Sequence, residues 1–245
     1  MRPYHSGIAR LRALYQLPTP PGNGAALELH LSDRGRVAGD QWPAELVVSC
    51  RLGALATRPW QGLAGVAGTH DCQVSYDAPL PFPPASFDLV ILHHTLDELA
   101  AVFRNRSAHQ VAGEWLQKIA AITRPGGVVV GCGLNRTSPR SRLRHQGAAS
   151  ATAERPALGI FSCRAALLRA GLQDVQVFNL WPDADAPSTI ASIDAAASRR
   201  AFRYVLESTR ESLSRSGYLT RRLVAELGIN RFLEETLFFW GYKPC

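Results

Sequence analysis

The sequence of 245 residues predicts an α/β fold, with a central, mostly parallel β-sheet covered by helices. Short apolar runs alternate along the chain with stretches whose apolar residues recur at helical spacing, and this order favours a parallel sheet. Two of the runs, "FDLVILHH" (87–94) and "VVVGCG" (128–133), are almost continuously apolar, as is typical of strands covered on both faces.

The chain opens with an amphipathic pattern over residues 4–17, which the segment "PTPPGNG" ends. We therefore expect an N-terminal helix and linker over 1–24, followed by one domain over 25–245. Within this domain the apolar patterns predict strands near 26–31, 45–50, 72–76, 87–93, 127–132, 174–180 and 236–242.

Helical stretches are predicted between and after these strands. Residues 109–123 have apolar side chains at helical spacing, and the turn "RPGG" follows them. The segment "SCRAALLRAGL" is expected to begin at an N-cap, Ser162, and to stop at Gly171. Residues 194–228 are expected to form helices broken near Gly217, either as a pair that faces the core or as a helical cap, an insertion or a dimer face.

The composition argues against a membrane-spanning, secreted or disulfide-rich protein. Hydrophobic residues make up 46% of the chain, and no run of about 18 apolar residues is present, so no membrane span is expected. The N-terminus has no apolar segment followed by a small-residue cleavage site, which argues against a secretory signal. The five cysteines are scattered, and their spacing fits neither a zinc site nor a disulfide framework. We expect a reduced, cytoplasmic protein without a metal.

The net charge of +7 has two interpretations. The arginines are solvated in a basic composition, or they meet an anionic substrate or a nucleic acid. Residues 136–157 are expected to form a flexible basic loop directly after a strand, and four arginines fall in its first half: Arg136, Arg140, Arg142 and Arg144. No aromatic residue is interleaved with them to stack on bases, which argues against nucleic acid.

The middle of the chain carries a recognisable order of motifs. The segment "LPFPPASFDLVILHHTLDEL" (80–99), followed by "ITRPGGVVVGCG", resembles the class I S-adenosylmethionine-dependent methyltransferases of the type 11 kind. The resemblance extends over residues 80–181. It implies a Rossmann-like, doubly wound sheet of seven mostly parallel strands, with the last strand antiparallel and helices on both faces. It also implies S-adenosylmethionine as the cofactor.

The resemblance places the cofactor at the carboxyl ends of the strands. The cofactor-binding residues that it implies are Glu28, His30, Ser49, Asp77, Ala78 and His93. Glu28 matches the acid that precedes the family's glycine-rich turn, but His30, Ser32 and Arg34 stand where glycines are expected. A second register puts Cys50, Leu52 and Ala54 in those places. The cofactor loop is therefore degenerate in either register, and we expect weak or absent cofactor affinity.

The remaining site residues are assigned from their positions after two strands. His93 and His94 lie where a general base for the acceptor is expected, and the more common explanation of such a pair is a core or capping histidine beside a solvated one. Asn135, Arg136 and Arg140 are expected to meet the acceptor. Three functions stay open: methyl transfer to a small molecule such as a natural-product or glycan precursor, a catalytically silent methyltransferase fold that acts as a binding or partner subunit, and nucleic-acid binding by the arginine loop.

Overall fold

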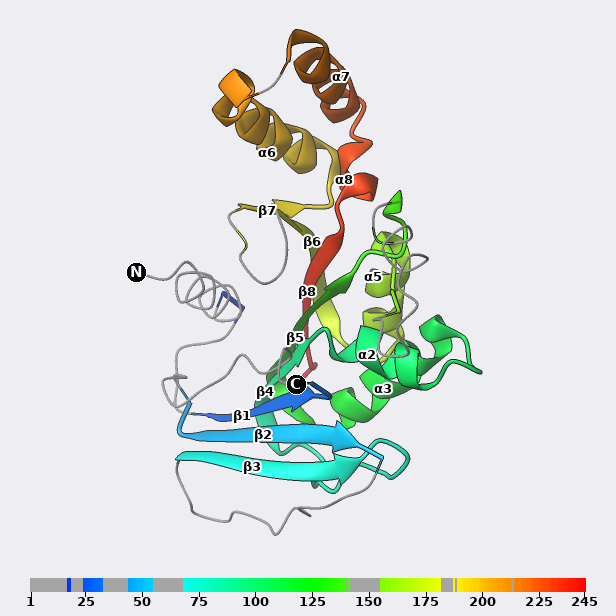
Figure 1. The fold of residues 1–245 in the computed structure, drawn as a ribbon. Coiled ribbons are helices and arrows are strands. Elements are labelled where there is room, and N and C mark those ends of the chain that lie inside the picture. Colours follow the sequence, from blue (N-terminus) through cyan, green and yellow to red (C-terminus); the bar gives the residue numbers. More distant parts are fainter. Residues whose placement is uncertain are drawn as a thin grey trace.

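A computed structural model describes residues 17–18, 24–32, 44–54, 68–139, 141, 155–181, 187, 189–212 and 214–245 of the chain. Its centre is an eight-stranded sheet in the order β3-β2-β1-β4-β5-β8-β6-β7 (Figure 1). The strands are β1 Ala25–His30, β2 Leu46–Gly53, β3 Gly68–Ser75, β4 Phe87–His93, β5 Thr123–Leu134, β6 Gln173–Trp181, β7 Thr189–Ser192 and β8 Thr236–Tyr242.

The direction of the strands agrees with the prediction. Strands β1 to β5 pair in parallel, whereas β8 runs antiparallel to both of its neighbours, β5 and β6. All seven predicted strands are present, but the expected total of seven is wrong because β7 adds an eighth strand, antiparallel to β6 at the sheet edge. The four residues of β7, "TIAS", are too few to show an alternation in the sequence.

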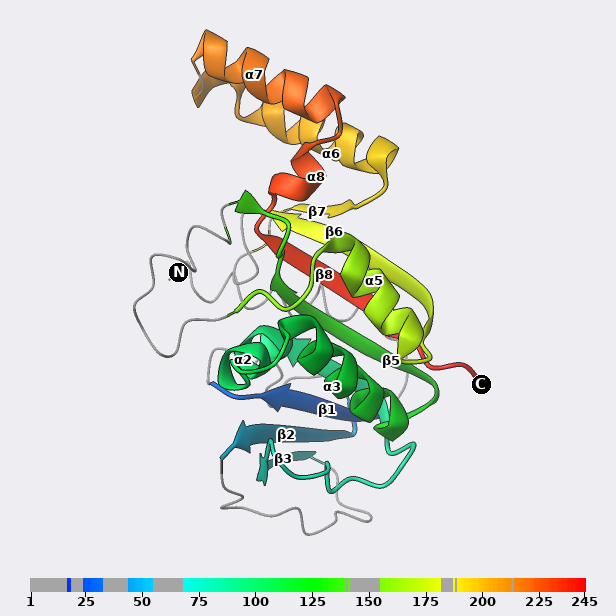
Figure 2. The same cartoon turned by 90° about the vertical axis from the view of Figure 1, so that its right-hand side faces the viewer.

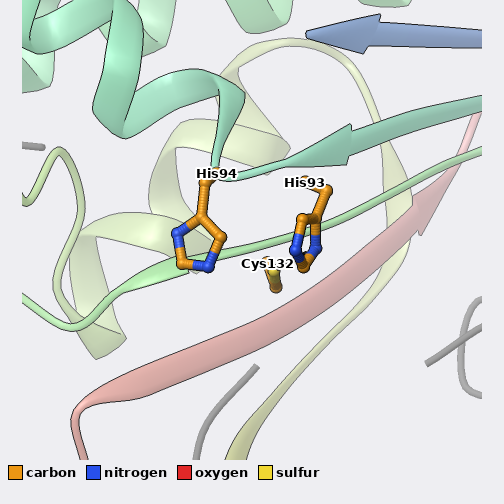
Figure 3. Close-up of side chains that lie close together, drawn as sticks. All are labelled: His93, His94 and Cys132. Atoms are coloured by element: carbon orange, nitrogen blue, oxygen red, sulfur yellow. Dashed lines mark hydrogen bonds between the residues drawn. The ribbon is translucent and has the colours of Figure 1, made fainter. Parts of the chain in front are cut away.

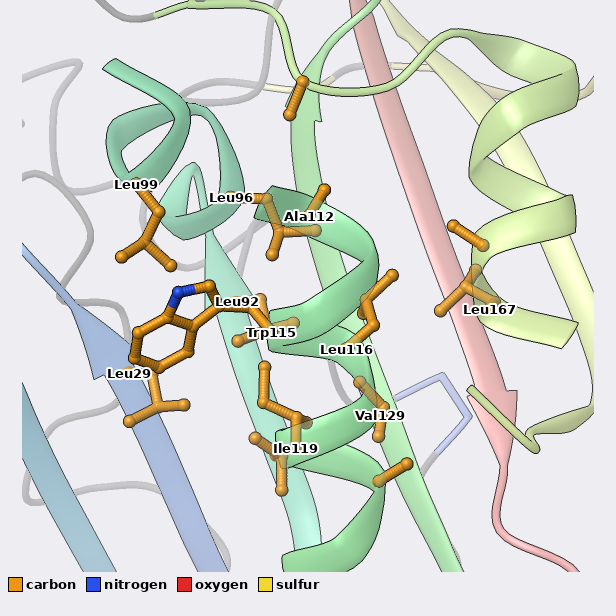
Figure 4. Close-up of a cluster of buried hydrophobic side chains, with 14 of the residues drawn as sticks. Leu29, Leu92, Leu96, Leu99, Ala112, Trp115, Leu116, Ile119, Val129 and Leu167 are labelled. Atoms are coloured by element: carbon orange, nitrogen blue, oxygen red, sulfur yellow. The ribbon is translucent and has the colours of Figure 1, made fainter. Parts of the chain in front are cut away.

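One face of the sheet is covered by three helices, α2 Thr95–Val102, α3 Ala108–Ile122 and α5 Ile160–Arg169 (Figure 2). Trp115, Leu116 and Ile119 lie on one side of α3 and pack between these helices and the strands (Figure 4). The opposite face also buries apolar side chains, among them Ile91 and Phe238. The Rossmann-like class is therefore confirmed.

The Asp and Arg of the motif "FD…RPGG" form an ion pair at the start of the strands. The carboxylate of Asp88, the second residue of β4, accepts a hydrogen bond from the backbone N–H of Ala25 at 2.8 Å. The same carboxylate pairs with Arg124 at 2.8 Å, which joins the beginnings of β1, β4 and β5. Gly127 allows the close approach, because a Cβ there would lie 2.9 Å from the carbonyl oxygen of Arg124 and 3.0 Å from that of Asp88.

Two helix boundaries differ from the prediction. Helix α5 begins at Ile160, so Ser162 is not the N-cap; its hydroxyl instead accepts a hydrogen bond from the N–H of Gly159, the true N-cap, at 2.8 Å. Gly171 does mark the end of this helix, with a φ of 85°. The break in the last helical region lies between α6 Ala195–Ser208 and α7 Arg215–Glu226, and Gly217 sits inside α7.

The C-terminal helices stand apart from the parallel strands. A short 3-10 helix (Arg210–Ser212) lies between α6 and α7, and α8 Asn230–Leu233 leads into β8. Both views place α6 and α7 at the β7 end of the sheet, away from β1–β3 (Figures 1 and 2).

The helix expected within 1–24 lies outside the described residues, which include 17–18 and 24 of that segment. Among the described residues, no helix is long and apolar enough to cross a membrane.

Candidate functional site

The carboxyl ends of β1, β2 and β4 carry buried polar side chains. Glu28 pairs in register with Ser49 on β2 and with Ile91 on β4. Because successive side chains of a strand point to opposite faces, Glu28 shares the face of Ala26, opposite the helices α2 and α3. Glu28 and Ser49 are buried, and Ser49 is the fourth of the eight residues of β2, which continues past the predicted end at residue 50.

The end of β1 is filled by an imidazole ring. His30 is 4% exposed, and its Nε2 lies 3.1 Å from the hydroxyl of Ser49. Its Nδ1 lies 3.2 Å from the carbonyl oxygen of Ser32, so a neutral ring donates there and accepts from Ser49. A bonded side chain therefore stands where the resembling family has a glycine.

The backbone that follows β1 is bound by a carboxylate of this chain. Glu98, in the first turn of α2, accepts a hydrogen bond from the N–H of Leu31 at 3.2 Å, and its other oxygen accepts from the hydroxyl of Ser32. A glycine turn would instead leave bare backbone for a cofactor to approach. Residues 30–32 therefore lack the bare backbone of a glycine turn, and a cofactor at this edge would meet side chains there instead.

His93 and His94 lie beside Cys132 rather than facing solvent (Figure 3). His93 is the last residue of β4 and pairs in register with Cys132 on β5, and its Nδ1 is 3.0 Å from the sulfur. The two imidazole rings meet edge to face, with centroids 4.8 Å apart. All three residues are at most 2% exposed.

The environment of Cys132 favours a thiolate. Burial acts to raise the pKa of the thiol, but the charges of His93 and His94 and their hydrogen bonds outweigh it and lower the pKa to about 5. By contrast, burial and the charge of Asp97 raise the pKa of the Cys163 thiol. The five cysteines are all free, as expected.

Asp97 organises the surroundings of this cluster. Its carboxylate accepts hydrogen bonds from the backbone N–H groups of Leu134 at 2.6 Å and Ala157 at 2.8 Å. Its Oδ2 also lies 3.6 Å from Nδ1 of His94. Gly133 makes room for the carboxylate of Asp97, because a Cβ at position 133 would lie 2.7 Å from Oδ2 of Asp97.

Asp77 and Ala78 lie after β3, at one end of a surface groove of about 390 Å³. The groove follows the connection from β3 to β4 and is also lined by Phe82 and by Lys118 of α3. Asp77 is exposed, and its backbone N–H donates to the hydroxyl of Ser75 at 3.2 Å. Neither Glu28 nor His93 lines this groove, so it does not bring together all of the expected cofactor residues.

The expected acceptor residues have different surroundings. Asn135 is buried: its amide nitrogen donates to the carbonyl of Glu234 at 2.9 Å, and its oxygen accepts from the N–H of Thr137 at 3.0 Å. It thereby ties the end of β5 to the start of β8. Arg136 is exposed next to it. Arg140 lies outside the described residues.

Three residues of the site were missed by sequence reasoning: Asp97, Glu98 and Cys132. The two acids lie in the first turn of α2. Acidic residues are common at this position of any helix, because they interact favourably with the helix dipole, so they gave no signal of a site. Cys132 is 39 residues from His93 in sequence. The available signal was that "LVILHH" and "VVVGCG" are adjacent parallel strands, whose ends must meet at one edge.

Comparison with known proteins places the fold. Neither a protein-family model nor the sequence of a curated protein matches the chain. Among solved structures, an S-adenosylmethionine-dependent methyltransferase from Archaeoglobus fulgidus matches with a TM-score of 0.57 and 14% identity, over 98% of this chain and 94% of that one. Phosphoethanolamine N-methyltransferase 2 from Haemonchus contortus, in complex with S-adenosyl-L-methionine, matches with a TM-score of 0.54 and 15% identity, over 97% of this chain and 53% of that one.

A third match is a Haloferax volcanii putative methyltransferase in complex with the Trm112 methyltransferase activator, with a TM-score of 0.51 and 16% identity, over 98% of this chain and 90% of that one. At these identities the likeness concerns the fold. The strand order, with an antiparallel β8 between β5 and β6, agrees with it. The chain has the fold of the class I S-adenosylmethionine-dependent methyltransferases.

Proposed function

We propose that the chain binds S-adenosylmethionine at the carboxyl edge of β1–β4 and transfers its methyl group to a small-molecule acceptor, such as a natural-product or glycan precursor. The observation that carries this proposal is the fold, because open parallel sheets bind ligands outside the carboxyl ends of their strands. The methyltransferase from Haemonchus contortus, solved with this cofactor, supports the choice of ligand.

In this proposal the cofactor contacts come from Glu28, His30, Ser49, Asp77, Ala78 and His93. Asp77 has the exposed carboxylate that an adenine amine requires. The cofactor, when bound, supplies an activated methyl group. The chain itself positions the acceptor in line with that group, and His93 or His94 takes the acceptor's proton. The acceptor contacts in this proposal come from Asn135, Arg136 and Arg140, and the two guanidinium groups supply the charge that an anionic acceptor requires.

Calorimetric titration of the full chain with S-adenosylmethionine, and with its demethylated product, tests the proposal. We expect Asp77→Ala to weaken binding, because a hydrogen bond to a charged group contributes about 1.5–3 kcal/mol, which corresponds to roughly a tenfold to hundredfold change in affinity. Asp71→Ala, within β3 and also exposed, is the matched control. Equal affinities for wild type and Asp77→Ala would remove Asp77 from the site.

The alternative function is a catalytically silent fold that serves as a binding or partner subunit. At the end of β1, His30 hydrogen-bonds to Ser49, and Glu98 accepts from the N–H of Leu31. These groups are bonded where a glycine turn would leave backbone for the cofactor, and this favours the silent fold. Absence of any binding of either cofactor form would support this alternative over methyl transfer.

A protein partner or a second copy would need a contact surface. Helix α7 exposes Leu219 and Leu223, and Leu227 follows directly after it, at intervals of one turn, with 56%, 61% and 63% of each residue accessible. The activator complex of the Haloferax volcanii protein is a precedent for a partner on this fold. Light scattering gives the mass of the purified chain, and a monomer at every concentration would contradict a homodimer.

A further inference from the structure

The cluster of His93, His94 and Cys132 has the donor atoms of a transition-metal site. One imidazole nitrogen from each histidine and the sulfur of Cys132 all lie within 4.8 Å of one another. The side chains come from the end of β4 and the neighbouring position of β5, and they converge on one point (Figure 3). Rigid, hydrogen-bonded strands therefore set the separation of the donors.

The backbone of His94 is what brings two successive histidines to the same side. Neighbouring residues of a regular strand point to opposite faces, so His94 would face away from Cys132. It instead has a φ of 57° and a ψ of 1°, in the left-handed region, and its N–H donates to the carbonyl of Cys132 at 3.0 Å. This region is unfavourable for a non-glycine residue, and such strain is concentrated at functional sites.

The chemistry of the donors selects the ion. Imidazole nitrogen and thiolate sulfur are ligands of Zn²⁺, whereas Mg²⁺ and Ca²⁺ require oxygen. Zn²⁺ binds the deprotonated sulfur and the neutral imidazoles, so loading the site releases protons. All three side chains are buried, so the donors are held among packed neighbours rather than by flexible surface segments.

A carboxylate lies close to one of the histidines, at a distance slightly longer than a hydrogen bond. Oδ2 of Asp97 is 3.6 Å from Nδ1 of His94, and two backbone N–H groups hold that carboxylate in place. A histidine that ligates a metal commonly donates its other ring N–H to such a group, which fixes the ring and its tautomer. His94 would then present Nε2 to the ion.

We propose that His93, His94 and Cys132 bind one Zn²⁺ ion, with a fourth position left for water or another ligand. With Zn–N distances of about 2.0–2.1 Å and a Zn–S distance of about 2.3 Å, tetrahedral ligands lie roughly 3.3–3.6 Å apart. The 3.0 Å between Nδ1 of His93 and the sulfur then widens, and the separations of up to 4.8 Å close, through small rotations of the side chains. The ion replaces the proton shared between Nδ1 of His93 and the sulfur. This site does not depend on S-adenosylmethionine, and while the ion is bound His93 and His94 do not act as bases.

Cobalt is the probe for the test, because thiolate coordination gives Co²⁺ an intense charge-transfer absorption that Zn²⁺ lacks. The full chain carries Cys245→Ser, since this cysteine is exposed and would bind metal by itself. After treatment with a chelator, the protein is titrated with Co²⁺ and then with Zn²⁺. We expect one equivalent of Co²⁺ with thiolate absorption, which one equivalent of Zn²⁺ abolishes.

Three variants locate the site. Cys132→Ser should remove the thiolate absorption, and His94→Gln should weaken Co²⁺ binding by more than the roughly 10–100-fold loss typical of an outer-shell partner. Cys163→Ser, another buried free cysteine, should leave both unchanged. X-ray absorption of the Zn²⁺-loaded parent protein needs no further variant, and we expect it to show one sulfur and two imidazoles around the ion.

Two results would overturn the proposal. One is the absence of bound Co²⁺ and Zn²⁺ in the parent protein at micromolar free metal. The other is a metal shell without sulfur, or an absorption that persists in Cys132→Ser. Either result leaves the methyltransferase proposal standing, because cofactor binding is measured separately by titration of the same protein.

Discussion

At the scale of single residues, close packing decides which glycines are required. Gly131 lies in β5 between β4 and β8, and a Cβ there would be 2.6 Å from Cζ of Phe239 and 2.7 Å from the carbonyl oxygen of Leu92. The phenyl ring can turn, but the carbonyl belongs to the hydrogen-bonded sheet. Gly113, within α3, has no atom within 4 Å of the same position. The same substitution should therefore have opposite effects at the two sites.

We expect Gly131→Ala to lower the free energy of unfolding by about 3 kcal/mol, at the upper end of the usual cost of overpacking. Gly113→Ala should raise it by about 0.5–1 kcal/mol, because alanine loses less conformational freedom in a helix. Urea denaturation of both variants measures the two changes. Equal effects at the two positions would mean that the packing around Gly131 yields to an added methyl group.

The sequence located several of the site residues, but it did not show which of them contact one another. Glu28 and Ser49 could be placed at strand ends from the apolar pattern alone. His30 could be placed there too, but not its hydrogen bond with Ser49, which depends on the register of β1 and β2. The cluster with Cys132 was hidden for the same reason. The left-handed conformation of His94 was missed because glycine is the residue that usually marks it in a sequence.

At the scale of elements, the apolar patterns located the strands well and the helix ends less well. Strand β4 was predicted with its observed limits, since a bulky buried run has sharp borders. Helix α5 begins two residues before Ser162, because serine at the third helical position can also bind the start of a helix: its hydroxyl accepts from the N–H of the N-cap, Gly159. Helix α7 begins after its N-cap Ser214, whose hydroxyl accepts from the N–H of Gly217, so this glycine lies in the first turn rather than at the break.

The N-cap of α6 gives the stability of this helix a dependence on pH. Hydrogen bonds from the N–H of Ala197 and, to a lesser degree, Ala196, each 3.0 Å long, hold the pKa of Asp194 below its ordinary value of 3.8. A carboxyl group with a lowered pKa stabilises the folded state fully above its unfolded pKa. That contribution is lost as the pH falls through the folded value.

We expect the melting temperature of wild type, compared with that of Asp194→Asn, to fall as the pH decreases below about 4. Asparagine keeps a capping oxygen that does not titrate, so the difference isolates the charge. Asp174→Asn makes the same change of charge away from a helix start and serves as the control for the loss of one negative charge. A constant difference between wild type and Asp194→Asn from about pH 6 to about pH 2.5 would contradict the role of the carboxylate.

At the scale of the whole molecule, the fold and the site are supported by different parts of the sequence. The sheet and its helical layer depend on apolar patterning, which is strongest in 80–181 and which identified the class. The proposed cofactor edge depends on the residues after β1, where the resemblance led us to expect glycines. There His30 and Glu98 hydrogen-bond to Ser49 and to the N–H of Leu31, so the chain has the methyltransferase fold with its own side chains bonded at this edge.

Because the sheet is complete while side chains are bonded at its proposed cofactor edge, we expect a folded protein that gains little stability from S-adenosylmethionine. With a dissociation constant of about 1 mM, about 1 mM cofactor adds only about 0.4 kcal/mol, or about 1–2 °C in melting temperature for a chain of this size. A low-micromolar site would add about 4 kcal/mol under the same conditions, or roughly 8–16 °C. Calorimetric melting of the full chain with and without the cofactor at that concentration distinguishes the two cases. The demethylated product serves as a second ligand, because it contains the same adenosine and amino-acid groups. A shift near the larger value for either ligand would show that the chain binds the cofactor without free backbone after β1, and that His30 and Glu98 move aside or form part of the site.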